Sequence, residues 1–120
     1  MKSIGDLDEK LVAALSYLFG PISGIVVLVM EKNNKFVRFH ALQSTLWFLF
    51  LAIVSWILNI ISSFPIIGWI LGIFINPILT ILGIIAIGSI IFLAYKAYNN
   101  ESFKIPIVGD VAWAQINKGA

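Results

Sequence analysis

The sequence predicts an all-α integral membrane protein with three transmembrane helices, a short interfacial or re-entrant segment before the third helix, and an amphipathic C-terminal tail. Two long runs support this class: Phe39 to Tyr95 and Leu11 to Met30 contain no Asp, Glu, Lys or Arg. Hydrophobic residues make up 60% of the chain and charged residues 12%, which is outside the range of soluble domains. About 20 apolar residues cross a hydrocarbon core about 30 Å thick. The runs therefore provide three spans in one membrane domain, residues 1–120.

The first span is expected at residues 11–30. Gly20 and Pro21 interrupt it and predict a kink, because proline removes a backbone donor and presses on the preceding turn. Gly20 and Gly24 are four residues apart and share a helix face, where another helix can approach closely. A polar loop then leads to the second span, which is expected at residues 41–61.

A connector at residues 62–76 is predicted to dip into the membrane or lie at its interface. It is apolar but interrupted by Pro65, Gly68 and Gly72, and it is too short for a span with its turns. Asn76 and Pro77 are placed as the N-cap and first residue of the third span, residues 77–95. A full crossing by the connector would give four spans, with a weaker charge difference between the two sides.

The expected location is the cell membrane, with several passes, the N-terminus outside and the C-terminus cytoplasmic. This orientation follows from the positive-inside rule. With three spans, the first loop and the tail, residues 96–120, share a side. They hold Lys32, Lys35, Arg38, Lys96, Lys104 and Lys118.

Polar side chains form a stripe along the second span. His40, Gln43 and Ser44 share a helix face, and the stripe continues to Asn59. Such side chains either bond neighbouring helices or form a polar groove for another segment. Candidate contacts with a partner or with lipid are Arg38, Phe39, His40, Gln43, Ser44 and Asn59. Candidate helix-packing positions are Gly20, Gly24, Gly68, Gly72, Asn76 and Gly83.

Enzymatic activity is not expected. The chain has one histidine and no cysteine, and it lacks the Gly-x-Ser-x-Gly turn of a serine hydrolase. No catalytic residue, metal site or cofactor is predicted. The loop cations are too few for a nucleic-acid surface, and anionic lipid headgroups are their expected partner.

Two segments resemble a known family. They are Phe36-Val37-Arg38-Phe39-His40-Ala41-Leu42-Gln43-Ser44 and Phe103-Lys104-Ile105-Pro106-Ile107-Val108-Gly109-Asp110-Val111-Ala112. Both are similar to segments of a family of small prokaryotic multi-pass membrane proteins of unknown function. The first also resembles the Phe-x-x-Phe-His-x-x-Gln stretch of the chloroplast Tic-twenty import component (Tic20-like). This resemblance implies a role around protein translocation or insertion, by analogy of fold.

Three functions remain open from the sequence. The first is a non-enzymatic, translocon-like or accessory protein that contacts other membrane segments through the polar edge of the second helix. The second is a small homo-oligomeric channel or transporter, because three helices alone hardly enclose a pore. The third is a structural protein that responds to anionic lipid.

Overall fold

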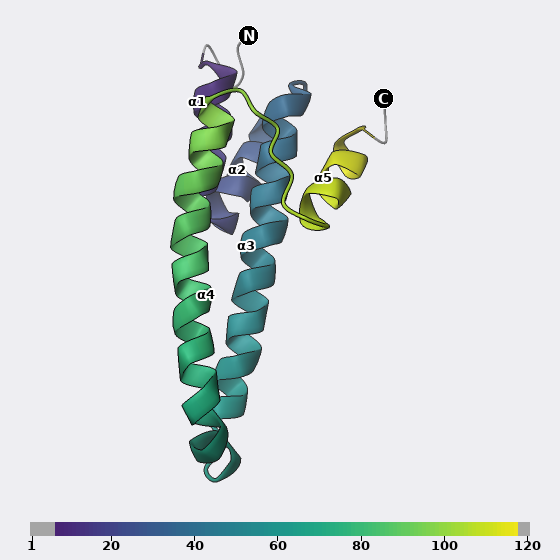
Figure 1. Ribbon diagram of the computed structural model, residues 1–120. Coiled ribbons are helices and arrows are strands. Elements are labelled where there is room, and N and C mark those ends of the chain that lie inside the picture. The colour runs from purple at the N-terminus through teal and green to yellow at the C-terminus, as the bar shows by residue number, and fades with distance from the viewer. Residues whose placement is uncertain (1–6, 118–120) are drawn as a thin grey trace.

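The computed structural model describes residues 7–117, which fold into five helices joined by short segments (Figure 1). Two of them, α3 and α4, form a long antiparallel hairpin. At 1.5 Å per residue they are about 42 and 48 Å long, and the other three helices are much shorter. The helices are α1 Glu9–Leu18, α2 Pro21–Met30, α3 Lys35–Ser62, α4 Ile67–Tyr98 and α5 Val108–Asn117. The all-helical part of the prediction is confirmed.

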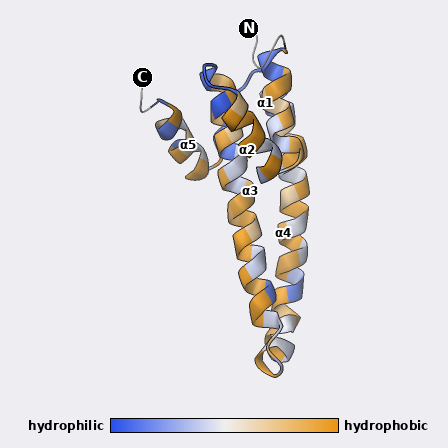
Figure 2. Ribbon diagram, turned by 180° about the vertical axis from the view of Figure 1, so that it is seen from behind, coloured by the Kyte–Doolittle hydropathy of each residue, from blue (hydrophilic) through white to orange (hydrophobic). Residues whose placement is uncertain are grey.

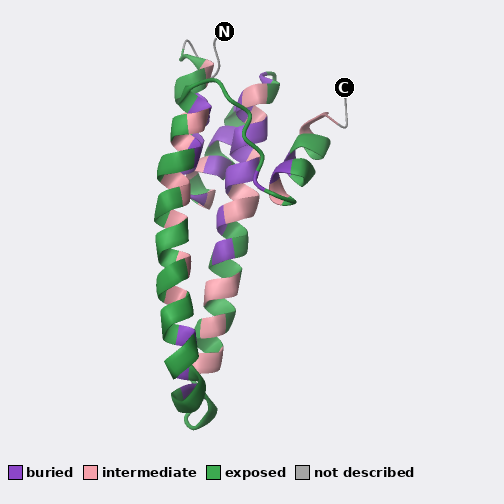
Figure 3. Ribbon diagram, viewed as in Figure 1, coloured by how far each residue is buried: buried purple, intermediate pink, exposed green. Residues whose placement is uncertain are grey.

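The α3–α4 hairpin has the length and composition of a membrane-crossing unit. Both helices are strongly apolar, and most residues of α4 and of the distal part of α3 are exposed or partly exposed (Figures 2 and 3). Trp56 and Trp69 are exposed near the turn between the helices, and Tyr95 is exposed near the far end of α4. Trp69 and Tyr95 are about 39 Å apart along the helix, which matches two aromatic belts at the faces of a bilayer.

The second predicted span, residues 41–61, lies within α3, and the helix begins six residues before that span, at Lys35. Asn34 caps α3 by accepting a hydrogen bond from the Val37 amide, 3.1 Å away. This cap satisfies one of the free donors in the first turn. The helix therefore starts at Lys35, and its first turns contain the polar residues that the sequence placed at the membrane entry.

The third helix begins ten residues before the predicted start. Only a short turn separates Ser62 from Ile67, and most of the predicted connector is the first part of α4. Pro77 lies inside the helix and not at its first position. The prediction failed because one proline removes one hydrogen bond, while the apolar surroundings strongly favour a continuous helix.

The predicted first span is not one helix. Gly20 has φ 62° and ψ −135°, a conformation that favours glycine, and the chain reverses there instead of kinking. The helices α1 and α2 have ten residues each, about 15 Å, which is half of a hydrocarbon core. The Asn34 Nδ2 after α2 donates to the Glu9 carboxylate at the start of α1, 2.8 Å away. The pair is therefore a hairpin whose two ends lie at the same end of the molecule.

This hairpin changes the arrangement expected for the two ends of the chain. Two long helices and a returning hairpin bring the start of α1 and the segment after α4 to the same end of the α3–α4 pair (Figure 1). Three spans would have separated them. The charged side chains of residues 7–117 lie outside the distal half of the long hairpin, in α1, the α2–α3 loop, the start of α3, the end of α4 and the tail.

After α4 the chain turns back along α3. Asn100 has φ 62°, the Glu101 amide donates to the Lys96 carbonyl, and the Asn100 amide donates to the Ala97 carbonyl. This is a Schellman ending, in which asparagine accepts the left-handed conformation. Residues 101–107, called the strap below, then run along α3 in a non-helical conformation. They lead into α5, which packs against α3.

Candidate functional site

Three buried side chains form the centre of the site. Tyr17 is on α1, while His40 and Gln43 are on α3, and all three are fully shielded from solvent. The Tyr17 hydroxyl is 2.6 Å from His40 Nδ1, and Gln43 Nε2 donates to the same hydroxyl at 2.8 Å. We call these three residues the polar ladder.

The ladder holds the strap through main-chain atoms. His40 Nε2 is 2.9 Å from the Glu101 carbonyl. Gln43 Nε2 donates to the Phe103 carbonyl at 2.9 Å, and Gln43 Oε1 accepts from the Ile105 amide at 2.8 Å. Residues 101, 103 and 105 alternate, as expected where an extended chain presents every second residue to one side.

These partners determine the hydrogen positions. A carbonyl oxygen can only accept, so the His40 Nε2 atom carries the hydrogen and its Nδ1 atom is the acceptor. The Tyr17 hydroxyl therefore donates to Nδ1 and accepts from Gln43. Each member is oriented by another, and no ladder nitrogen or oxygen is left without a partner, which is the condition for a stable buried polar network.

Ser44 extends the polar cluster to the hairpin turn. Its hydroxyl is buried and lies 2.6 Å from the Ser16 carbonyl and 3.2 Å from the Gly20 carbonyl. Ser23 also donates to the Ser16 carbonyl, at 2.9 Å. The helix break at Gly20 leaves the Ser16 carbonyl without its helical partner, because the Gly20 amide bonds the Tyr17 carbonyl instead. The two serine hydroxyls satisfy the Ser16 carbonyl.

Arg38 and Phe39 also contact the protein itself. The Arg38 guanidinium donates to the carbonyls of Leu28 and Glu31 at the end of α2, where a cation is favoured by the helix dipole. Phe39 is fully buried, and its ring meets His40 and Trp113 edge to face. In this structure the two side chains therefore join α2, α3 and α5 to one another.

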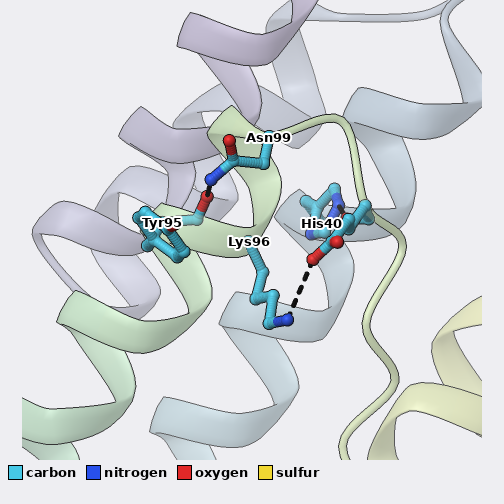
Figure 4. A network of polar contacts seen from close by, with 5 residues as sticks. His40, Tyr95, Lys96 and Asn99 are labelled. Atoms are coloured by element: carbon cyan, nitrogen blue, oxygen red, sulfur yellow. Dashed lines mark hydrogen bonds and ion pairs between the residues drawn. The ribbon is translucent and has the colours of Figure 1, made fainter.

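An ion pair holds the beginning of the strap. Lys96 Nζ is 3.0 Å from the Glu101 carboxylate. Figure 4 shows Lys96 and His40 close to each other, with Asn99 bonded to the Tyr95 carbonyl on the preceding turn. Both partners of the ion pair are partly exposed, so it contributes about 0–1 kcal/mol. The buried ladder is the stronger anchor.

A second feature is a groove between α3 and α4 in the half of the hairpin that α1 and α2 do not reach. It has a volume of about 500 Å³. Pro21, at the tip of the short hairpin, closes one end, and Asn59 lies toward the distal turn. The groove is lined by Pro21, Phe48, Leu51, Ala52, Ser55, Asn59, Leu79, Leu82, Gly83 and Ala86.

The predicted packing glycines occupy different surroundings. A Cβ at Gly24 would lie 2.6 Å from Thr45 Oγ1, so this glycine is where α2 approaches α3 most closely. A Cβ at Gly68 would meet the Ser62 carbonyl in the hairpin turn, whereas nothing lies within 4 Å of one at Gly83. Gly20 forms the reversal, Gly72 is buried, and Asn76 is exposed on α4.

Sequence reasoning found His40, Gln43 and Ser44 but missed the groups that complete the site. Tyr17 lies within the predicted first span, and the strap lies within the predicted cytoplasmic tail, so neither is among the predicted site residues. One signal was available. A histidine and a glutamine on one face of an apolar helix need partners, and the two segments of the family resemblance are the ones that meet here. Asn59 lies far from the ladder and bonds the Ser55 carbonyl.

The donor set of the ladder matches the main-chain groups of a polypeptide. An imidazole N–H and an amide that both donates and accepts match the main-chain groups of an extended segment. Within residues 7–117, no group of three or more His, Cys, Asp or Glu side chains is close enough to hold a metal ion.

The fold and the site define a small helical membrane protein, with a long apolar hairpin and a half-length hairpin tied together by a buried polar ladder. Residues 8–112 match the model of the magnetosome magnetite crystal formation protein family, MamF/MmsF. The chain belongs to this family. The ladder, the whole strap and the groove lie within the matched residues.

Relatives support the membrane assignment. The chain is 46% identical to a UPF0132 membrane protein of Archaeoglobus fulgidus, over 92% of this chain and 97% of that protein. It is 44% identical to a UPF0132 membrane protein of Methanocaldococcus jannaschii, over 88% of this chain and 86% of that protein. The Tic20 family protein Ycf60 of Cyanidioschyzon merolae is 28% identical over 98% of this chain, which spans 59% of that relative. No solved structure matches.

These comparisons confirm the resemblance to a small prokaryotic membrane protein family and the distant relation to the Tic20 family. They also place this chain among membrane proteins.

Proposed function

We propose that this protein is a non-enzymatic, translocon-like or accessory membrane component that holds an apolar segment of another membrane protein in the groove between α3 and α4. The observation that carries this proposal is the half-length hairpin. Because α1 and α2 stop at Pro21, the distal half of the α3–α4 pair lacks the neighbours that cover its other half.

The groove suits a helix. Its floor contains the small residues Ala52, Ser55, Gly83 and Ala86, and small residues allow helix backbones to approach closely in membranes. Its walls are apolar and it contains no charged side chain. Asn59 uses one of its two amide hydrogens within its own helix, so the other is available to a polar group on an incoming segment.

The relation to the Tic20 family supports a role with other polypeptides in membranes, as the resemblance of the Phe36–Ser44 segment implied. We place the charged end of the molecule in the cytoplasm. Within residues 7–117 all lysines and arginines belong to α1, the α2–α3 loop, the start of α3, the end of α4 and the strap. Lys and Arg near the ends of spans favour the cytoplasmic side, and Lys32 and Lys35 are then available to anionic headgroups.

Site-specific photo-crosslinking in cells tests the proposal. A photoreactive residue at Ala52 or Asn59 faces the groove, whereas one at Ile57 lies on α3 outside the groove lining and is exposed. We expect crosslinks to another membrane protein from the two groove positions and much weaker ones from Ile57. Equal yields at all three positions would mean random neighbours in the lipid and would contradict the proposal.

A matched pair of glycine substitutions provides the second arm. Gly83 lines the groove and Gly88 does not, and a Cβ at either position meets nothing within 4 Å. Gly83→Leu should fill the groove and reduce the partner crosslink from Asn59 at least about fivefold, the effect of removing a close helix contact worth about 1 kcal/mol. Gly88→Leu should leave the crosslink unchanged.

The homo-oligomeric channel is the alternative outcome of the same experiment. Crosslinks only to a second copy, together with ion or solute flux in liposomes, would favour it. The family description also mentions crystal formation. The absence of a metal-holding cluster among residues 7–117 gives no support for extending that role to this chain, so the proposal rests on the groove.

A further inference from the structure

The hydrogen bonds between the ladder and the strap do not involve the strap's side chains. All three ladder contacts go to main-chain atoms, the carbonyls of Glu101 and Phe103 and the amide of Ile105. Of these three strap residues, only Ile105 is buried, with 8% of its surface exposed. Recognition of an extended chain through alternate main-chain groups and one buried side chain is a common way for proteins to bind peptides.

The ladder does not need the strap to keep its orientation. Tyr17 is fully buried behind His40 and Gln43 and bonds both of them. The groups that face the strap are therefore held in position from the side opposite the strap. A preorganised site of this kind loses little freedom when it binds a segment.

The strap carries signs of an exchangeable segment. Ile107 has φ 68°, and a β-branched residue in that region of backbone conformation is strained. Its side chain is 78% exposed, so no burial of that side chain offsets the strain. Among the described helices, α5 packs against α3 only. Release of the strap from α3 would relieve the strain at Ile107. It would also separate α5 from α3, the one helix against which α5 packs.

We propose that the polar ladder is a binding site for an extended segment of another polypeptide, and that the protein's own strap occupies this site until such a segment replaces it. An emptied ladder would leave buried donors and an acceptor without partners, which is unfavourable. The replacement is therefore an exchange of one backbone for another. The incoming segment needs free main-chain groups at alternate positions and an apolar side chain in the place of Ile105. This site is separate from the groove, and its test does not depend on the groove.

Gly109 is not a ladder residue, and a substitution there should release the strap from the ladder. A Cβ there would lie 2.6 Å from Gln43 Oε1 and 2.6 Å from the Lys104 backbone, so Gly109→Ala should loosen the docked tail. The full-length protein in nanodiscs of neutral phosphatidylcholine is titrated with a fluorescent peptide of residues 99–109, followed by anisotropy. We expect Gly109→Ala to bind at least about tenfold more tightly than the wild type. Gly88→Ala, the uncrowded control, should match the wild type, and adding Gln43→Leu to Gly109→Ala should remove the gain.

A modified peptide tests whether the backbone is what is recognised. Methylation of the Ile105 amide nitrogen removes the hydrogen that Gln43 accepts and leaves every side chain unchanged. Binding should fall about fivefold to tenfold, as expected for one net hydrogen bond. Alanine at the exposed positions Ser102 and Lys104 of the peptide should change binding by less than about threefold. Equal binding of the methylated and unmethylated peptides would overturn the proposal.

Two further experiments test the exchange without the Gly109→Ala variant. Ile105→Asp should also expel the strap, because it puts a charge in a buried position, and it should raise peptide binding as Gly109→Ala does. In the wild-type protein, a peptide with photo-leucine at the Ile105 position should crosslink to α3 near Gln43, and amide methylation should reduce that product about fivefold to tenfold. The exchange would be refuted if neither variant bound the peptide more tightly than the wild type while both kept their helix content. It would also be refuted if the wild-type protein gave no specific crosslink.

Discussion

Replacing Tyr17 by phenylalanine tests the central role of the ladder, since it removes one oxygen and changes little else. That hydroxyl is the donor to His40 Nδ1 at 2.6 Å and the acceptor for Gln43 Nε2 at 2.8 Å. Both partners are fully buried, so neither can turn to solvent. Each buried group left without a partner costs about 1–3 kcal/mol. The free energy of unfolding should therefore fall by about 2–6 kcal/mol.

The assay is reversible unfolding in mixed micelles, followed by circular dichroism. Tyr95→Phe is the matched control, because Tyr95 is 66% exposed and its loss should change stability by less than about 0.5 kcal/mol. In a double-mutant cycle, Gln43→Leu removes one of the groups that Tyr17→Phe leaves unpaired. The two changes should therefore cost less together than the sum of each alone, by about 1–2 kcal/mol. Equal stability of Tyr17→Phe and Tyr95→Phe would refute the reasoning.

Two more predictions address packing and topology. Gly24→Ala should lower thermal stability in detergent by about 1–3 kcal/mol, because its Cβ would lie 2.6 Å from a side-chain oxygen of α3 in a packed interface; Gly88→Ala, in open space, should be neutral or slightly stabilising. Because the chain contains no cysteine, single cysteines at Lys10, Ser102 and Ser63 report topology by labelling with a membrane-impermeant maleimide. The first two should react from the same side and the third from the other, whereas opposite sides for Lys10 and Ser102 would restore three spans.

The membrane character of this chain could be predicted because it depends on composition alone. An uncharged run from Phe39 to Tyr95 has few alternatives to a bilayer, and both α3 and α4 fall largely within it. Helix ends were less predictable. Pro77 disfavours a continuous helix, whereas the strongly apolar environment favours one. The environment has the larger effect.

The reversal at Gly20 could not be derived from local sequence. The same Gly-Pro pair is compatible with a kinked span and with a hairpin turn. The outcome depends on groups distant in sequence, since Ser44 on α3 and Ser23 on α2 satisfy the Ser16 carbonyl that the reversal exposes. A glycine that can adopt positive φ permits the turn, but tertiary hydrogen bonds select it.

For a similar reason, the residues of the candidate site on α3 could be predicted, but their partners could not. Periodicity identifies which side chains share a face of α3, so His40 and Gln43 stood out. Periodicity within one helix carries no information about its partners. Gln43 bonds residues about 60 positions later in the chain, and Tyr17 lies in a run that contains no charged residue and indicates a membrane span. The need of buried polar groups for partners predicts that such contacts exist, but it does not identify them.

The half-length hairpin also affects the bilayer that surrounds the protein. With α3 and α4 spanning a bilayer as proposed, one leaflet would meet four helix segments, because α1 and α2 lie beside α3 and α4 there, while the other leaflet would meet only two. The molecule therefore displaces more lipid from one leaflet than from the other and has the shape of a wedge. Where many copies gather, this difference in area favours a membrane that curves, with the wide end of each copy on the convex face.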